Sequence, residues 1–284
     1  MTSAASPSRL PSDEQVDAAV ELLRGRHLAV LTGAGISTDS GIPDYRGEGA
    51  PQRTPMTFAQ FLSDPTYRQR YWAGSHLGWR SFGLAHPNTT HRILAEWEQA
   101  GRVSGVVTQN VDGLHRRAGS ARLVELHGAM DQVGCLACGQ RFAREAIAAR
   151  MVADNPWLDE LHATEIAPDG DAVPTEVARF VVPECSVCGG MLKPDVVFFG
   201  EFVPTERFAE ARSIVEGAEA LLIAGSSLAV NSGVRLLEVA RRRGMPVLIV
   251  NVGATKGDAK ATLKIDAGAA ETLTALAAGL EDAE

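Results

Sequence analysis

The sequence predicts an α/β fold in which a doubly wound, Rossmann-like parallel sheet carries a smaller zinc-binding lobe. Short apolar runs that end in glycine or polar residues alternate with helical patterns, which is typical of a parallel sheet with helices on both faces. Two segments, 48–85 and 129–194, interrupt this alternation, and the second contains two C-x-x-C pairs. We expect these two insertions to build the smaller lobe.

Local patterns indicate the individual elements. Ser12 and Gln15 have the spacing of a capping box before an apolar helical face, so we expect a helix over 13–25. The run HLAVLTG, residues 27–33, is continuously apolar and ends in glycine, as buried parallel strands do. Asn88 is the expected N-cap of a later helix. The other expected strands are 103–110, 123–128, 195–200, 220–227, 245–253 and ATLKIDA, and the other expected helices are 205–217, 233–243 and 270–280.

These elements divide the chain into four kinds of segment. The expected division is a disordered tail at 1–12, a Rossmann-like domain from 13–47, 86–128 and 195–284, a helical insertion at 48–85, and a zinc-binding module at 129–194.

Composition excludes several classes of protein. The net charge of −8 argues against a nucleic-acid or anionic-membrane surface and is compatible with a basic partner such as a lysine-bearing protein segment. No apolar run approaches the roughly 20 residues of a membrane span. The start, MTSAASPSRLPS, lacks the apolar core of a secretory signal. We therefore expect a cytoplasmic protein that binds neither nucleic acid nor membranes.

All four cysteines fall in C-x-x-C pairs, and this spacing in a cytosolic-looking chain indicates a metal rather than disulfides. Four thiolates make a closed tetrahedral site with no open position for substrate, so the expected zinc ion is structural. The alternative is a redox pair, which is weaker because such motifs occur singly near a βαβ unit. The predicted ligands are Cys135, Cys138, Cys185 and Cys188.

The predicted strands end in glycine or polar residues. Ligands of doubly wound sheets bind at these carboxyl ends, where glycine lets backbone N–H groups approach phosphates and serine or asparagine can bind ribose or base edges. The alternative is that glycine and serine merely end the strands. The first turn, TGAGIS, starts like a dinucleotide site but continues into a polar loop instead of a helix. The strand-end candidates are Gly33, Gly35, Gly225, Ser226, Ser227, Asn251 and Gly253.

His127 stands apart from the other histidines because it ends a strand just before the cysteine-rich module. It is a candidate general base, since imidazole titrates near neutral pH. The alternative is a core histidine that binds a backbone carbonyl. Asn110, Asp112 and Asp44 are candidates for orienting a bound ring or ribose, although Asp112 also fits an ordinary Asp-Gly turn and Asp44 also fits a cap.

The motifs GAGISTDSGIPDYR, TQNVD, HG, the two C-x-x-C pairs, KPDVVFFGE, GSS and NVG occur in the order found in sirtuins, and the chain resembles that family from about residue 14 to 280. Sirtuins are NAD-dependent protein lysine deacylases. RQRYWAGSHLGW, KPDVVFFGE and the long gap between cysteine pairs look most like the class II, mitochondrial lipoamidase and ADP-ribosyltransferase type. The tail lacks transit character, so we expect a bacterial relative.

The resemblance implies how the strand-end loops act. The segment 36–53 corresponds to a mobile loop that closes over NAD, and His127 corresponds to the catalytic base, with Asn110 and Asp112 beside it. The implied cofactor-binding residues are Gly33, Ala34, Gly35, Ser37, Asp44, Tyr45, Arg46, Gln109, Asn110, Asp112, His127, Gly225, Ser226, Ser227, Asn251, Val252, Gly253 and Ala269.

The implied reaction breaks the nicotinamide–ribose bond. The acyl oxygen of a modified lysine attacks C1′, nicotinamide leaves, and His127 deprotonates a ribose hydroxyl that attacks the acyl carbon. The products are free lysine, nicotinamide and an O-acyl-ADP-ribose. A lysine-bearing strand is expected between VFFGE and SSLAV. The implied substrate residues are Tyr71, Val197, Phe198, Gly200 and Glu201, and the alternative for Val197 and Phe198 is an ordinary core position.

One position departs from the relatives that remove acidic acyl groups. These carry Tyr-x-x-Arg, whereas this chain has Tyr71 followed by Gly74, so a carboxylate loses its bidentate partner. Acetyl or longer apolar acyl groups are left open. Two other functions also stay open: transfer of ADP-ribose to a protein through the same site, and a non-catalytic NAD-sensing module, which an intact His127 disfavours.

Overall fold

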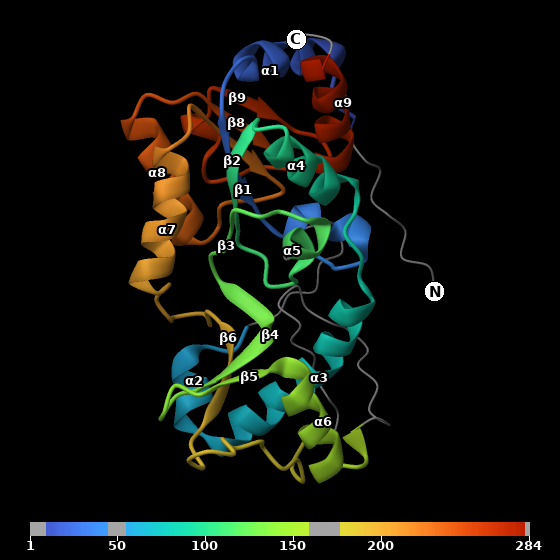
Figure 1. Cartoon of the computed structure of the whole chain (residues 1–284), viewed down its shortest axis with the longest axis vertical. Helices are drawn as coiled ribbons and strands as arrows, with labels where there is room; N and C mark the ends of the chain where they lie inside the picture. Colours follow the sequence, from blue (N-terminus) through green and yellow to red (C-terminus); the bar gives the residue numbers. More distant parts are fainter. Residues whose placement is uncertain (1–9, 45–54, 159–176, 282–284) are drawn as a thin grey trace.

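The computed structural model of the chain describes residues 10–44, 55–158 and 177–281, and it confirms the predicted fold class. Figure 1 shows two lobes, one around a six-stranded sheet and a smaller one around a three-stranded sheet. Tyr45, Arg46 and most of the expected tail lie outside the described residues.

The large sheet is parallel throughout, and its strand order is β3-β2-β1-β7-β8-β9. This is the order of a Rossmann sheet, with the switch point between β1 and β7, where such sheets bind their ligands. ATLKIDA provides the sixth strand, as expected. The strands are β1 (Leu28–Thr32), β2 (Val103–Thr108), β3 (Leu123–Glu125), β7 (Ala220–Ala224), β8 (Val247–Val250) and β9 (Leu263–Ile265).

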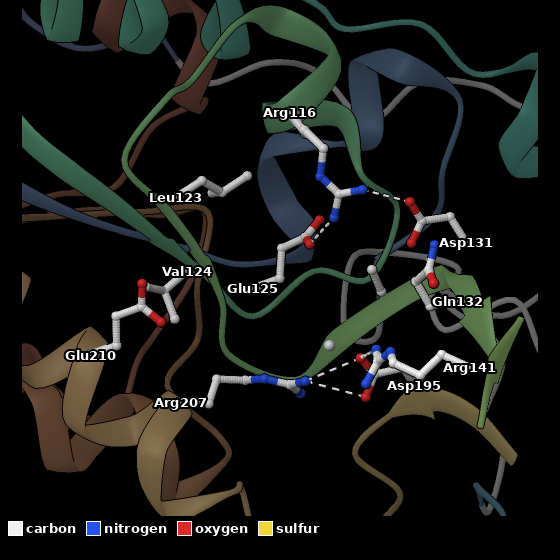
Figure 2. A pocket seen from close by; sticks show the side chains of 12 residues that line it. Arg116, Leu123, Val124, Glu125, Asp131, Gln132, Arg141, Asp195, Arg207 and Glu210 are labelled. Carbon is white, nitrogen blue, oxygen red and sulfur yellow. Dashed lines mark hydrogen bonds and ion pairs between the residues drawn. The ribbon is translucent and has the colours of Figure 1, made fainter. Parts of the chain in front are cut away.

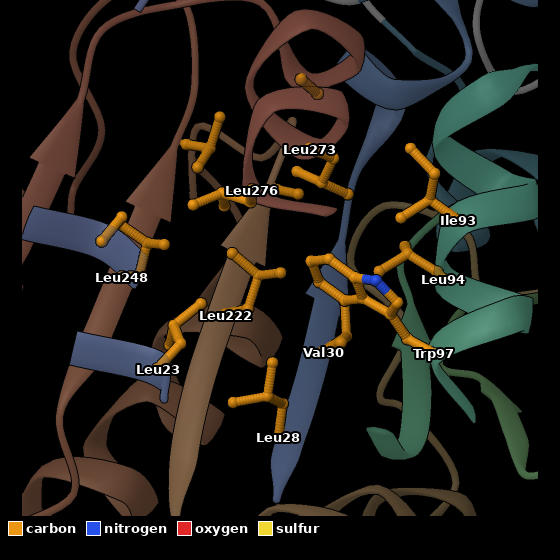
Figure 3. Close-up of a cluster of buried hydrophobic side chains, with 14 of the residues drawn as sticks. Leu23, Leu28, Val30, Ile93, Leu94, Trp97, Leu222, Leu248, Leu273 and Leu276 are labelled. Atoms are coloured by element: carbon orange, nitrogen blue, oxygen red, sulfur yellow. The ribbon is translucent and has the colours of Figure 1, made fainter. Parts of the chain in front are cut away.

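Helices cover both faces because successive side chains of each buried strand alternate between them. Leu28 and Val30 of β1 lie in one core with α1, α4 and α9, whereas Ala29 and Leu31 lie in another with α7 and α8. Figure 3 shows the first core, in which Trp97 packs among leucines of the sheet and helices. These helices are α1 (Asp13–Leu23), α4 (Thr89–Gln99), α7 (Thr205–Glu216), α8 (Asn231–Arg242) and α9 (Ala269–Glu281).

The smaller lobe joins the two insertions around an antiparallel sheet of order β5-β4-β6. Its core contains aromatic residues of both insertions, including Phe61, Trp72 and Phe180. The elements of this lobe are α2 (Phe58–Ser63), α3 (Pro65–Leu84), β4 (Gly128–Cys135), β5 (Arg141–Ala143), α6 (Arg144–Asp154) and β6 (Leu192–Val196).

One predicted strand is wrong in both extent and sheet. Residues 195–200 were expected to continue the parallel sheet, but β6 ends at Val196 and pairs antiparallel with β4. An apolar run indicates burial without indicating the partner strand, and β4 itself carries glycine, aspartate and glutamine. The residue ranges of the domains stay a prediction.

The two predicted N-caps are confirmed, whereas the helices expected from 233 and 270 begin at Asn231 and Ala269. Ser12 and Gln15 form a reciprocal capping box, and Asn88 caps α4. Among the helices of the described residues, none is both long and apolar enough to cross a bilayer.

Candidate active site

The ends of β1 and β7 touch through glycines at the switch point. Gly35 N donates to Gly225 O at 2.9 Å, and a Cβ on Gly33 or Gly35 would lie 2.8 or 2.9 Å from the carbonyl oxygen of Gly225. Gly225 has a φ of +61°, which side chains rarely adopt. These glycines are therefore required for contact between the two loops, in addition to any approach to a phosphate. Ala34 lies in the short 3-10 turn Ala34–Ile36 after β1.

A buried polar network lies beside this contact, at the end of β2. Asn110 Nδ2 donates to Ser37 Oγ at 3.1 Å and to Gly33 O at 3.1 Å. Ser37 Oγ donates to Asp112 at 2.8 Å, and Asp112 also accepts from the backbone N of Leu114 at 2.9 Å. Burial raises the pKa of Asp112, although these hydrogen bonds oppose the increase. The structure thus brings together three residues that the sequence places on two different strand ends.

His127 follows β3 and is held at both ring nitrogens. Its Nδ1 lies 3.0 Å from Gln109 O, and its Nε2 lies 2.8 Å from Ser232 Oγ. A carbonyl oxygen only accepts, so Nδ1 carries the proton and Nε2 keeps its lone pair. Burial lowers the pKa of His127 to about 4, and Arg207 adds to this effect. The imidazole is therefore neutral at physiological pH and can accept a proton at Nε2.

Gln109 connects His127 to the end of β7. Gln109 Oε1 accepts from Ser226 Oγ at 2.6 Å, and the backbone N of Gln109 donates to Thr32 O of β1 at 2.9 Å. Ser227 follows, half-buried, and its carbonyl accepts from Lys256 N at 3.1 Å. The ends of β1, β2, β3 and β7 therefore meet at one edge of the sheet.

The remaining cofactor candidates lie farther along that edge. Asn251 follows β8, is buried, and donates to Val252 O at 2.7 Å, whereas the Val252 side chain is exposed. Gly253 N donates to Asp266 at 2.9 Å. Ala269 starts α9, which packs against the turn after β1. Asp44 is half-buried.

The substrate candidates meet the small lobe. The ring of Phe198 lies 4.8 Å from that of Tyr71, and both side chains are buried. Val197 N donates to His127 O at 2.8 Å, so this segment runs directly past the histidine. Glu201 accepts from Phe198 N at 2.9 Å and pairs with Lys193 at 3.1 Å. Gly200 has a φ of +80°, as the turn between them requires.

The sequence did not indicate a buried cation beside Tyr71. Arg144 of α6 is fully buried, donates to Ser75 Oγ at 3.1 Å and stacks on Trp72. Its Nε and Nη1 are buried and have no hydrogen-bond partner among the residues that the structure describes. Burial lowers the pKa of Arg144 to about 10, so it stays protonated at neutral pH. The turn of α3 that contains Gly74 is therefore close to a guanidinium from another element.

A separate pocket of about 220 Å³ is lined by the neighbours of His127 in the sequence, including Glu125 and Gly128, but not by His127 itself. Figure 2 shows that Arg116 lies between Glu125 and Asp131, and that Asp195 pairs with Arg207 and Arg141. Because its arginines already pair with carboxylates, this pocket is not the candidate active site.

The four cysteines come together as predicted. Their sulfurs all lie within 4.8 Å of one another, with Cys135 and Cys188 at 3.6 Å and Cys138 and Cys185 at 3.8 Å. Zn–S bonds of 2.3 Å in a tetrahedron separate sulfurs by about 3.8 Å. The site therefore fits a structural zinc ion. Gly190 is essential here, because a Cβ would lie 2.7 Å from Ala137 and 3.1 Å from two sulfurs.

Acid should destabilise this fold through its buried histidines. Burial lowers the pKa values of His91 and His127 to about 4 and that of His115 well below its usual value. Below pH 6.5 these histidines bind protons in the unfolded chain, whereas in the folded chain they stay neutral down to about pH 4. The free energy of unfolding should therefore fall through this window, by roughly 2 kcal/mol per histidine between pH 7 and 5. Urea unfolding at fixed ionic strength with excess zinc measures this slope.

His91→Gln supplies the matched variant, because glutamine also suits the capping position of α4 that His91 occupies. The slope should become shallower in this variant. Equal slopes for the two proteins would contradict the assignment.

Comparisons with known proteins agree with this site. A family model described as the Sir2 family matches residues 33–232. NAD-dependent protein deacetylase 1 of Mycobacterium avium is 51% identical over 91% of this chain and 93% of its own length. The mitochondrial NAD-dependent protein lipoamidase sirtuin-4 of Bos taurus is 46% identical over 87% of this chain and 81% of its own.

Solved structures give the same result. One from a study of the mechanism and regulation of Sir2 enzymes superposes with a TM-score of 0.76 at 30% identity, over 96% of this chain and all of that one. A Sir2 complex with a p53 peptide and NAD+ superposes with a TM-score of 0.70 at 32% identity, over 91% of this chain and 95% of that one. The predicted family and NAD-dependent deacylase class are therefore confirmed, and this chain belongs to the Sir2 family.

Proposed function

We propose that this chain removes acyl groups from lysine side chains of proteins and consumes NAD in the reaction. The observation that carries the proposal is His127, a neutral imidazole whose Nε2 is unprotonated and accepts a hydrogen bond from Ser232. It lies beside the Asn110–Ser37–Asp112 network and the glycine contact at the switch point. This arrangement places a base and fixed polar groups where a Rossmann sheet binds a dinucleotide.

NAD supplies an electrophilic ribose carbon, C1′, and nicotinamide as the leaving group. We assign Asn110 and Asp112 to the nicotinamide and its ribose, because they point into one network from the end of β2. The absence of side chains at Gly35 and Gly225 suits close approach of the phosphates, and Ser226 and Asn251 suit the adenosine half. His127 then takes a proton from a ribose hydroxyl, so that the oxygen can attack the acyl carbon.

The acyl-lysine segment is assigned to a position between residues 197–201 and 226–230, where it would pair with the backbone as an added strand. Tyr71 and Phe198 form the apolar wall of the acyl channel. Backbone pairing of this kind gives affinity with little sequence selectivity. The partner is therefore defined by its modified lysine.

A cytoplasmic location is part of the proposal. Zinc ligation needs four reduced thiolates, which persist in a reducing compartment. The negative net charge suits lysine-bearing protein segments rather than nucleic acid.

Incubation with NAD and a panel of peptides tests the function. The peptides carry acetyl, longer apolar and acidic acyl groups, the last because of Arg144. We expect loss of the acyl mass from at least one peptide, with matching amounts of nicotinamide and O-acyl-ADP-ribose. Labelling of protein by ADP-ribose without deacylation would instead support the transferase, and NAD binding without turnover would support the sensing module.

A further inference from the structure

Ser232 is hydrogen-bonded to Nε2, the basic nitrogen of His127. Its Oγ lies 2.8 Å from Nε2, while Nδ1 is committed to the carbonyl of Gln109. Because Nδ1 carries the ring proton, the hydroxyl of Ser232 must donate to the lone pair of Nε2. Any group that gives a proton to His127 must therefore displace Ser232 or pass the proton through it.

The structure favours passage of the proton through Ser232 over displacement of Ser232 from the histidine. Ser232 is 7% exposed and lies in the first turn of α8. The next residue, Gly233, is so close to Gln109 that a Cβ there would lie 3.1 Å from the amide nitrogen. This turn of α8 therefore packs directly against Gln109, whose carbonyl binds the other nitrogen of the same ring. Its N-cap, Val230, makes no side-chain bond, and the Ser232 hydroxyl points to the histidine instead of capping the helix.

The hydroxyl of Ser232 also has unused accepting capacity. A serine oxygen can donate one proton while its lone pairs accept, and no other described residue bonds to Ser232 Oγ. We propose that Ser232 relays a proton from the ribose hydroxyl to His127, an inference that rests on the proposed deacylase function.

Two protons move in the relay. The ribose O–H bond breaks and its proton joins Ser232 Oγ, while the Ser232 O–H bond breaks and that proton joins His127 Nε2. An imidazolium and a ribose alkoxide result, and the serine is again a neutral hydroxyl. The alkoxide then attacks the acyl carbon.

Two readouts separate a relay from a structural role. Nicotinamide leaves before the base acts, so Ser232→Ala should retain exchange of labelled nicotinamide into NAD in the presence of acetyl-lysine peptide. The same variant should form O-acetyl-ADP-ribose roughly 10- to 100-fold more slowly. In the wild-type protein, single-turnover rates in H₂O–D₂O mixtures should curve with the deuterium fraction, because two protons move.

The controls are Ser232→Thr, which keeps the hydroxyl and should keep product formation, and Ser213→Ala on the exposed side of α7, which should change neither rate. Undiminished product formation by Ser232→Ala, a parallel loss of exchange and product, or a linear deuterium dependence would each overturn the relay. Wild-type turnover of the acetyl peptide tests the proposed function separately, so failure of the two ideas can be distinguished.

Discussion

Replacing His127 with alanine should lower O-acyl-ADP-ribose formation about 10³-fold, the scale of a positioned general base. The variant removes the acceptor of the ribose proton but leaves the Asn110–Ser37–Asp112 network and the glycine contact in place. NAD affinity should therefore change little. Product formation is followed by mass spectrometry and NAD affinity by calorimetry.

His86→Ala is the matched control, because His86 is exposed and lies outside the site. It should retain wild-type rates. A His127→Ala protein with an unchanged melting temperature and full turnover would remove histidine from the reaction. A large loss of NAD affinity would show that the ring binds the cofactor rather than acting as a base.

Loss of the zinc site should unfold the smaller lobe. Structural zinc contributes about 10–16 kcal/mol in small zinc-binding peptides, which matches or exceeds the whole stability of a typical domain. Cys135 ends β4 and pairs with Leu192 of β6, and the sulfurs of the other three cysteines lie within 4.8 Å of its own. Cys135→Ser should therefore lose the bound zinc, reduce the folded yield and abolish turnover. Elemental analysis should find one zinc ion per wild-type chain.

Val187→Ser is the matched control for this site. Val187 lies inside the second C-x-x-C pair and is 67% exposed, so the substitution should retain zinc and stability. Hydrogen exchange locates the damage: protection should be lost first in β4 and β6 and retained in β1 and β7. A Cys135→Ser protein with one equivalent of zinc and unchanged protection would contradict a structural role.

Local chemistry made much of this molecule predictable from sequence. The cysteine spacing specifies its ligand set without knowledge of the fold. Continuous apolar runs indicate the buried parallel strands, and capping residues such as Asn88 indicate where helices start. Because parallel strands end at one edge, the sequence alone groups the candidates near Gly33, Asn110 and Gly225.

Contacts between distant elements were not predictable. Ser232 is 105 residues from His127 and reads as an ordinary polar residue at a helix start. Arg144 reads as a surface position of an amphipathic helix, yet it is fully buried against α3. The strand predicted at 195–200 was assigned to the wrong sheet because its apolar residues fit either sheet. In each case the position depends on a contact with a residue or strand that is distant in the sequence, and the local sequence pattern does not specify that contact.

The attachment of His127 to both sheets has a mechanical consequence. Its backbone carbonyl binds Val197 beside β6, its ring binds the end of β2, and the next residue, Gly128, fits only without a side chain because a Cβ would lie 1.8 Å from Asp195 O. The imidazole therefore sits at the junction of the two lobes. A rotation of one lobe against the other about this junction would displace the far rims most and this ring least.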